Sequence, residues 1–172
     1  MTGRRYEFSW DLIGDIEVGR PNLGPNTRLE VYRLMQFTLR DALEQQYGTE
    51  KADEIFYQAG YLAGNEFYKH VLGEQCDFNE FIRNLQSILK KMGIGVLKVE
   101  KADLEQGSFV LTVSEDLDCS GLPDLEYEIC IYDEGFISGL LESFTGKHYR
   151  VKEVDCWCTG DRTCRFTAEL MD

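Results

Sequence analysis

The sequence predicts an α+β protein in which helices of the N-terminal half pack on a C-terminal antiparallel sheet of about four strands. Three observations support this prediction. Apolar residues recur at helical spacing as far as about residue 92, they alternate with other residues from about residue 97 onwards, and one short helical pattern interrupts the alternating part. Helices that come first and strands that follow are typical of the α+β class.

The composition is that of one folded domain. The chain has 172 residues, of which 43% are apolar and only 3 are proline. Chains of about 100–200 residues usually form a single domain. We therefore expect one domain over residues 27–172, preceded by an arm of residues 1–26 that has some strand character and takes part in a dimer.

Three helices are predicted in the first half. The first runs from about residue 27 to residue 47 and ends at Gly48. The second begins at the capping residue Thr49 and runs to about residue 72, and the third follows the capping residue Asp77 and ends at Gly93. Each carries a stripe of apolar residues that a sheet or another helix could cover.

The second half has the pattern of strands. Alternation over residues 97–100 and 109–113 predicts two strands, and residues 149–154 and 164–170 predict two more, joined by a turn. Between the two pairs, residues 133–146 predict a short helix that ends at a glycine.

The charge of the chain excludes two classes of partner. It has 18 lysine and arginine residues against 31 aspartate and glutamate residues, a net charge of −13. Such a charge repels nucleic-acid phosphates and anionic lipid, so we expect neither nucleic acid nor a membrane as partner. No segment approaches the roughly 20 apolar residues of a membrane span. The first residues also lack the apolar core of a signal peptide, so we expect a cytoplasmic location.

The cysteines are the most informative residues. Five of the six (119, 130, 156, 158 and 164) lie in the last 54 residues. In a reducing compartment, cysteines indicate metal binding or reactive thiols before they indicate disulfides.

One spacing stands out among them. Cys156 and Cys164 flank the turn between the last two predicted strands, Glu153 lies three residues before Cys156, and Cys130 precedes the short helix. Three thiolates and one carboxylate suit a tetrahedral zinc ion, and four protein ligands make a closed, structural site. The alternative is that these cysteines are small buried apolar residues. If Cys119 and Cys158 also took part, an iron–sulfur cluster would be possible.

These residues resemble the 4-vinyl reductase domain family, named after a protein of bacteriochlorophyll synthesis. The resemblance covers about residues 95–170 well and the helical half more weakly, through Gly60-x3-Gly64. It rests on three motifs: Cys130-x4-Gly135-Phe-Ile-Ser-Gly-Leu-Leu-Glu142, Thr145-Gly-Lys147, and Glu153-x2-Cys156-x3-Gly160-Asp161-x2-Cys164-Arg-Phe166.

The resemblance implies both a fold and a metal site. The family includes sensor domains that detect phenols and other aromatic hydrocarbons, and its fold is similar to a ligand-binding domain shared by nitric-oxide-sensing and Golgi-transport proteins. In the aromatic sensors, three cysteines and a glutamate hold zinc beside the ligand pocket. On this chain the corresponding residues are Cys130, Glu153, Cys156 and Cys164.

A ligand pocket is expected beneath the helices. We predict that it is lined by Phe109, Leu111, Val151 and Phe166 from the strands, with a hydroxyl group from Tyr61; the alternative is that all five only fill the core. The phenol sensors hold the ligand hydroxyl with a histidine and a tryptophan, and residues 71–115 contain neither. We therefore expect a more lipophilic ligand that forms fewer hydrogen bonds.

No catalytic or cofactor motif is present. The chain has only two histidines, and it contains no P-loop, no Gly-x-Ser-x-Gly and no His-Glu-x-x-His. Asp133 and Glu134 are interpreted as surface charge at the start of a helix. We therefore expect a binding protein and not an enzyme, despite the reductase in the family name.

We predict a stand-alone domain that binds or senses a small hydrophobic or aromatic molecule, with a structural zinc site. It is expected to form a homodimer and to act on a separate protein. Two alternatives remain open. One is an iron–sulfur or thiol-based redox protein that uses Cys119, Cys156 and Cys158, and the other is an accessory carrier of a hydrophobic intermediate such as a tetrapyrrole.

Overall fold

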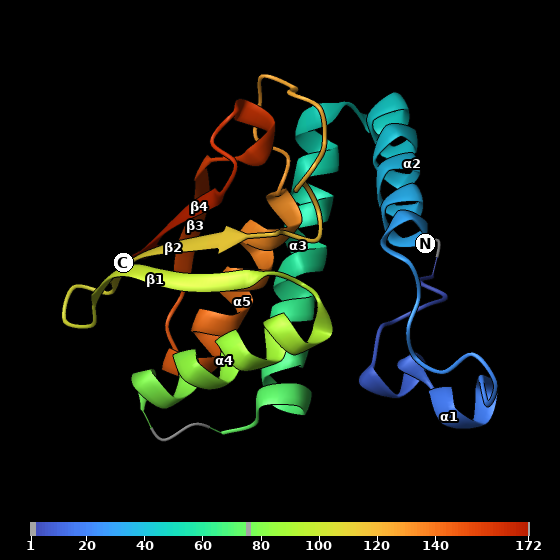
Figure 1. Cartoon of the computed structure of the whole chain (residues 1–172), viewed down its shortest axis with the longest axis horizontal. Helices are drawn as coiled ribbons and strands as arrows, with labels where there is room; N and C mark the ends of the chain where they lie inside the picture. The colour runs from blue at the N-terminus through green and yellow to red at the C-terminus, as the bar shows by residue number, and fades with distance from the viewer. Residues whose placement is uncertain (1–2, 75–76, 172) are drawn as a thin grey trace.

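The computed structural model describes residues 3–74 and 77–171 and confirms the predicted α+β class (Figure 1). Helices make up most of the first half, and the strands follow with one helix between them. In chain order the elements are η1 (Trp10–Ile13), α1 (Ile16–Gly19), α2 (Leu29–Tyr47), α3 (Thr49–Phe67), η2 (Tyr68–Leu72), α4 (Phe78–Met92), β1 (Val96–Asp103), β2 (Ser108–Ser114), α5 (Ile131–Thr145), β3 (Tyr149–Asp155), η3 (Trp157–Thr159) and β4 (Cys164–Leu170).

The strands form one antiparallel sheet in the order β1-β2-β4-β3. Leu111 of β2 lies opposite Phe166 of β4, and Phe166 lies opposite Glu153 of β3. Residues paired across neighbouring strands point to the same face, and so do residues two apart in one strand. Leu111, Phe166, Glu153 and Cys164 therefore share one face, which the helices cover.

Helices α4 and α5 pack against this face. Phe78 at the start of α4 stacks on Phe109 of β2, with 5.3 Å between the ring centroids. Ser138 of α5 donates a hydrogen bond from its hydroxyl to the carbonyl oxygen of Tyr149 in β3, at 2.8 Å. The two helices thus lie beneath different halves of the sheet and enclose the core between them.

Helix α3 packs on α5 through glycines. A Cβ atom on Gly60 would lie 2.0 Å from the carbonyl oxygen of Tyr132, and one on Gly64 would lie 2.2 Å from that of Phe136. From the other helix, a Cβ atom on Gly139 would lie 2.3 Å from the carbonyl oxygen of Tyr61. The small residues therefore serve close packing inside one subunit.

Most of the predicted helix ends are confirmed, but Thr49 is not a capping residue. The N-cap of α3 is Gly48, and the Thr49 hydroxyl donates a hydrogen bond to Oε2 of Glu44 at 3.1 Å. Helix α2 ends before Gly48 and α4 ends before Gly93, as expected. The carboxylate of Asp77 caps α4 by accepting a hydrogen bond from the backbone N–H of Glu80 at 2.9 Å. The second predicted helix ends as expected at residue 72, but its last turn, from Tyr68, is the π-helix η2.

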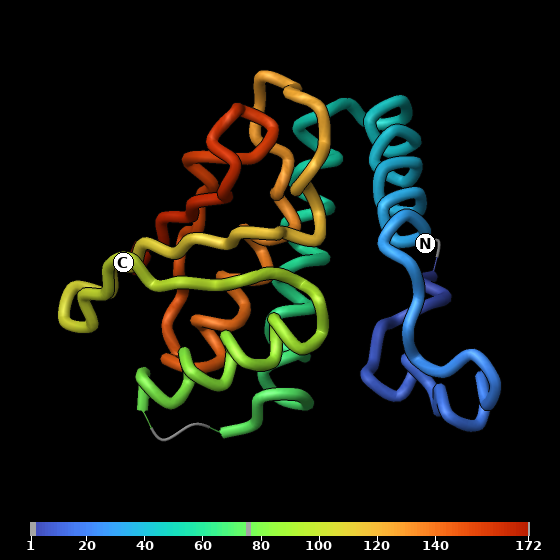
Figure 2. Tube along the Cα trace, viewed as in Figure 1, coloured from blue at the N-terminus to red at the C-terminus, as the bar shows by residue number. Residues whose placement is uncertain are grey.

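The strand character predicted for the arm is wrong. Over residues 3–28 the structure has the two short helices η1 and α1 and no strand. The N–H groups of the arm bond within local turns, as Leu12 does to Ser9 at 3.0 Å, and Trp10 stacks on His70 at 4.8 Å. The trace in Figure 2 shows the reason: the arm lies on the side of α2, away from both edges of the sheet.

Within the part of the chain that the structure describes, no helix has both the length and the hydrophobicity needed to cross a lipid bilayer.

Candidate metal centre and ligand cavity

Four buried thiols meet where β3 ends and β4 begins. Cys156 follows β3, Cys164 opens β4, and Cys130 is the residue before α5, as its motif predicts. Cys119, in the loop after β2, joins them. All four side chains are fully buried, and their Sγ atoms lie within 4.8 Å of one another.

Two of the three thiol–thiol distances match a tetrahedral metal site, and the third, between Cys119 and Cys164, is shorter. The Sγ atom of Cys130 lies 3.9 Å from that of Cys156 and 3.8 Å from that of Cys164, and the Sγ atom of Cys119 lies 3.1 Å from that of Cys164. Thiolates bound tetrahedrally at about 2.3 Å from zinc are roughly 3.8 Å apart. Hydrogen bonds from the other thiols, first that of Cys119, hold the pKa of Cys156 well below its ordinary value, whereas the pKa values of Cys119, Cys130 and Cys164 are raised. The thiolate is the form that binds metals, so this buried cluster could hold one.

Glu153 lies beside the thiols, and one of its two carboxylate oxygens has no hydrogen-bond partner among the described residues. Its side chain is only 1% exposed, and Oε2 accepts a hydrogen bond from the backbone N–H of Cys130 at 3.1 Å. The oxygen without such a partner in residues 3–74 and 77–171 is Oε1. Burial and the nearby Cys156 thiolate raise the pKa of Glu153 to about 8. A buried carboxylate oxygen without a partner is costly unless a proton or a metal satisfies it.

The structure therefore brings together the three predicted cysteines and adds Cys119, while Glu153 lies next to the cluster, hydrogen-bonded to the backbone of Cys130. Cys119 could have been found from the strand register. Val113, near the end of β2, pairs with Cys164, so the loop that leaves β2 starts at the predicted site. Cys158 is also buried but is not one of the four clustered thiols, and Cys76 lies outside the described residues.

Buried carboxylates surround the other side of Cys130. Asp116 is 4% exposed and accepts hydrogen bonds from the backbone N–H groups of Asp118 at 2.8 Å and Cys119 at 3.1 Å. Burial, and then the charge of Asp118, raise the pKa of Asp116 to about 7. Burial also raises the pKa of Asp133 well above its ordinary value, and its Oδ2 atom has no hydrogen-bond partner in the described structure.

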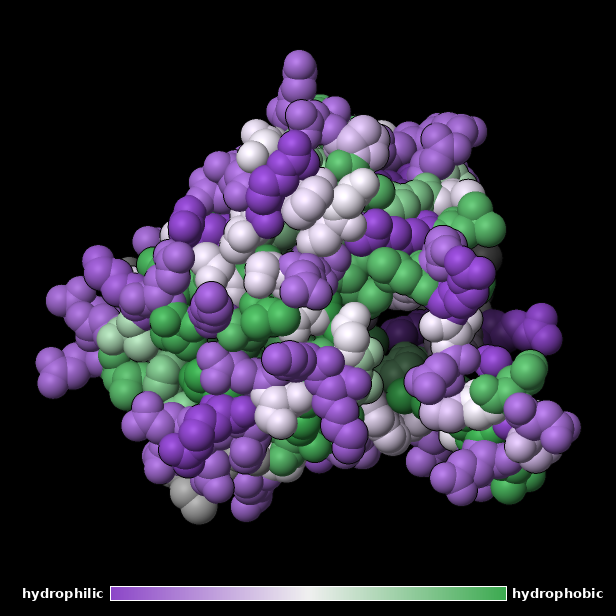
Figure 3. Space-filling view, in the orientation of Figure 1, coloured by the Kyte–Doolittle hydropathy of each residue, from purple (hydrophilic) through white to green (hydrophobic). Residues whose placement is uncertain are grey.

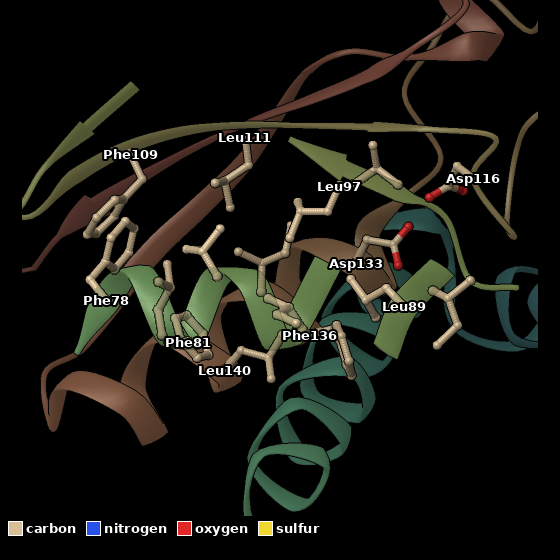
Figure 4. Close-up of a pocket in the computed structure, with 16 residues that line it drawn as sticks. Phe78, Phe81, Leu89, Leu97, Phe109, Leu111, Asp116, Asp133, Phe136 and Leu140 are labelled. Atoms are coloured by element: carbon tan, nitrogen blue, oxygen red, sulfur yellow. The ribbon is translucent and has the colours of Figure 1, made fainter. Parts of the chain in front are cut away.

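The interpretation of Asp133 and Glu134 as surface charge is wrong. Glu134 is 5% exposed and accepts hydrogen bonds from the backbone N–H of Glu153 and from Nζ of Lys152, both at 2.9 Å. Asp133 faces the interior (Figure 4). The first turn of α5 is covered on one side by the edge strand β3 and on the other by the loop after β2, which the sequence pattern of α5 alone does not reveal.

An apolar cavity of about 40 Å³ lies between the sheet and the two helices beneath it. Figure 4 shows Phe78 and Phe109 at one end and the two carboxyl groups of Asp116 and Asp133 at the other. Apart from these carboxyl groups the lining is apolar: Phe78, Phe81, Ile82, Leu85, Leu89, Ile94, Leu97, Phe109, Leu111, Val113, Phe136, Ile137, Leu140 and Leu141.

Two of the five predicted pocket residues line this cavity, Phe109 and Leu111. Val151 and Phe166 are buried on the same face of the sheet, 2% and 0% exposed, but they belong to the half of the sheet over α5 and do not line the cavity. Tyr61 lies in a separate surface cleft with His148 and Tyr149, because α5 stands between α3 and the cavity.

The loop after β2 also anchors α2. The Tyr32 hydroxyl donates a hydrogen bond to Oδ1 of Asp118 at 2.8 Å. The Arg33 guanidinium donates hydrogen bonds to the carbonyl oxygens of Leu117 and Ser120, each at 2.9 Å. Residues 116–120 therefore touch the cavity through Asp116, the thiol cluster through Cys119, and α2.

Sequence comparison finds relatives in a methanogenic archaeon. The chain is 27% identical to MJ0150 of Methanocaldococcus jannaschii over 112 residues, which cover 65% of this chain and 64% of that protein. It is 24% identical to MJ1642 of the same organism over 150 residues, 87% of this chain and 82% of that protein. The chain thus spans slightly less than two thirds of the length of MJ0150.

Several solved structures share the fold, among them these three. A vinyl-4-reductase family protein from M. jannaschii matches with a TM-score of 0.62 at 16% identity, over 99% of this chain and 100% of that one. The phenol-responsive sensory domain of the transcription activator PoxR matches with 0.60 at 17% identity, over 77% and 71%. Trafficking protein particle complex subunit 3 from Naegleria fowleri, covalently bound to palmitic acid, matches with 0.64 at 16% identity, over 84% and 95%.

The family comparison agrees with the motifs. Residues 109–170, from β2 to the last residue of β4, match the V4R domain family, and this segment contains the four clustered thiols and Glu153. The resemblance to 4-vinyl reductase domains predicted from the sequence is therefore confirmed, since residues 109–170 match the V4R domain model and a vinyl-4-reductase family protein shares the fold.

Proposed function

We propose that this protein binds a small hydrophobic or aromatic molecule beneath its sheet and reports the binding to a protein partner. The observation that carries the proposal is the apolar cavity with a polar end formed by Asp116 and Asp133. Ligand sites are typically apolar with few polar groups that orient the ligand. Two structures with this fold support a hydrophobic ligand: the phenol-responsive domain of PoxR, solved with phenol, and the trafficking subunit bound to palmitic acid.

The size of the cavity favours a small ligand. Pockets that enclose drug-sized molecules have volumes of about 300–1,000 Å³, far above the 40 Å³ observed. Even a single aromatic ring would require α4 to move outward from the sheet. A tetrapyrrole carrier would require a much larger rearrangement, so we favour the sensor over the carrier.

We further propose that the thiol cluster holds zinc. The thiolates of Cys130, Cys156 and Cys164 would provide three ligands, and the closed site would join β3, β4 and α5 structurally. The fourth ligand would come from Glu153 or Cys119. Four thiolates also suit an iron–sulfur centre, which is the redox alternative.

We expect the protein to work in the cytoplasm, where a reducing environment keeps buried cysteines as thiols.

Metal analysis tests the centre. Purified without a metal-binding tag, the protein is expected to contain one zinc per chain by elemental mass spectrometry and to be colourless. Cys156→Ser should lose the zinc, whereas Cys158→Ser, which changes a buried cysteine outside the cluster, should keep it. Iron together with a brown colour would replace the zinc proposal by the redox alternative.

Thermal unfolding tests the cavity. Toluene is expected to raise the unfolding temperature of the wild-type protein, because it binds the folded state alone. Leu111→Phe fills the cavity and should abolish the shift, whereas Leu62→Phe, at a 41% exposed position of α3, should preserve it. A shift with phenol but none with toluene would contradict the lipophilic ligand that we expect.

A further inference from the structure

The proposed metal centre has one donor more than it needs. A structural zinc ion binds four ligands. Around this centre the structure places three thiols from the predicted motif, a fourth thiol from Cys119, and the carboxylate of Glu153. Two side chains from different parts of the fold, Cys119 and Glu153, are therefore candidates for the fourth ligand position.

The geometry favours Cys119 over Glu153 as the fourth ligand. Cys119 is already in the cluster, with its Sγ atom 3.1 Å from that of Cys164, and its backbone N–H is held by Asp116 at 3.1 Å. Glu153 is fixed beside the cluster by its other oxygen, Oε2, which accepts a hydrogen bond from the backbone of Cys130. Its Oε1 atom is buried and has no partner in the described part of the chain.

We infer that Cys119 is the resident fourth ligand and that Glu153 is a reserve ligand that replaces it when Cys119 leaves. This inference rests on the metal centre proposed above. In the exchange one thiolate leaves the metal and one carboxylate takes its place. The charge of the centre stays the same. Only the loop of residues 116–120 has to move, since Glu153 is held in the interior of β3.

X-ray absorption at the zinc edge tests the inference, with zinc as the only added ligand. In the wild-type protein we expect four sulfur ligands at about 2.3 Å. Cys119→Ala should keep one zinc per chain with three sulfurs and one oxygen at about 2.0 Å. Glu153→Gln should keep all four sulfurs. Cys158→Ala, a buried cysteine outside the cluster, is the control and should match the wild type.

The double variant separates Glu153 from a water molecule as the replacing oxygen. If Glu153 is the reserve ligand, Cys119→Ala combined with Glu153→Gln should bind zinc at least 10-fold more weakly than Cys119→Ala alone. Glu153→Gln alone should change the affinity less than 3-fold. The loss in the double variant would then exceed the product of the single losses, as expected for residues that substitute for each other.

Two outcomes would overturn the inference while leaving the zinc proposal intact. One is a wild-type centre with three sulfur ligands and one oxygen ligand. This measurement uses the wild-type protein alone, so a variant that fails to fold cannot affect it. The other is loss of zinc from Glu153→Gln alone, which would make Glu153 the resident ligand. A wild-type protein that binds no zinc would overturn the metal centre itself.

Discussion

At the scale of single residues, the interior of this protein is unusual for its acidity. Asp116, Asp118, Glu134 and Glu153 are each at most 5% exposed, whereas ionised carboxylates are almost never buried without a partner. Here backbone N–H groups and one lysine stabilise the carboxylates, and burial raises the pKa values of Asp116 and Glu153, which favours their uncharged form. The clustering of thiols and carboxyls on one side of the core is a consequence of the strand register, which brings Cys164 and Glu153 to the same face.

Asp116 should make the stability of the metal-free protein depend on pH. Its pKa is raised from 3.8 to about 7 in the folded state, chiefly by burial, so between these values the folded state holds a proton that the unfolded chain has lost. Its contribution to the free energy of unfolding is present below pH 3.8, falls as pH rises towards 7, and is constant above that.

Urea unfolding of the wild type and of Asp116→Asn, both treated with chelator, measures this contribution. The stability of the wild type relative to the variant should fall between pH 4 and pH 7 by at most about 1.4 kcal/mol per pH unit. Asparagine keeps an oxygen that can accept the two backbone hydrogen bonds. A difference that rises with pH over this range would contradict the assignment.

At the scale of elements, the contact of α3 with α5 leaves no room for side chains. Gly64→Ala would place a Cβ atom 2.2 Å from the carbonyl oxygen of Phe136, and this backbone atom cannot move aside as a flexible side chain would. Overpacking of this kind costs about 1–3 kcal/mol, so the variant should unfold at lower urea concentration. Gly19→Ala, at the end of α1 with nothing near the added atom, is the control. Equal stability of the two variants would show that the helices can separate freely.

The sequence predicts where helices and strands begin and end better than it predicts which residues pack together in the fold. Helix ends such as Gly48 and Asp77 are local signals, because capping and glycine chemistry act within a few residues, and these predictions are confirmed. The sequence offers Cys119 only as an alternative ligand and suggests a surface position for Glu134, because strand pairing and the inward face of α5 decide what surrounds these two residues. Tyr61 was expected in the pocket because the order of the helical layers does not follow from periodicity. Metal binding by the predicted ligands stays a prediction.

At the scale of the whole molecule, α2 presents an apolar surface that the single chain does not cover. Val31, Leu34, Met35 and Leu39 are 58%, 68%, 63% and 51% exposed. Figure 3 shows hydrophobic side chains at the surface over α2 and a hollow between the arm and the rest of the molecule. Exposed apolar patches of this kind mark interaction surfaces, which supports the homodimer predicted from the sequence.

Light scattering coupled to size-exclusion chromatography tests the dimer. We expect a mass near twice the 19.8 kDa of one chain. Leu34→Glu, which puts a charge in the middle of the apolar surface of α2, should convert the dimer into a monomer. Leu104→Glu, at a 58% exposed position after β1, should leave the dimer intact. A wild-type monomer would refute the dimer, and the apolar surface of α2 would then be assigned to the downstream protein.

The hydrogen bonds from Tyr32 and Arg33 to residues 116–120 have a thermodynamic consequence. One short loop is shared by the cavity, the thiol cluster and the helix that bears the exposed apolar surface. If a ligand in the cavity changes how firmly a partner holds α2, then that partner must change the affinity for the ligand by the same factor, because coupling between two binding sites is reciprocal. The affinity of the isolated protein for its ligand would then differ from that of the assembled complex, and ligand binding measured in both states would give the coupling free energy directly.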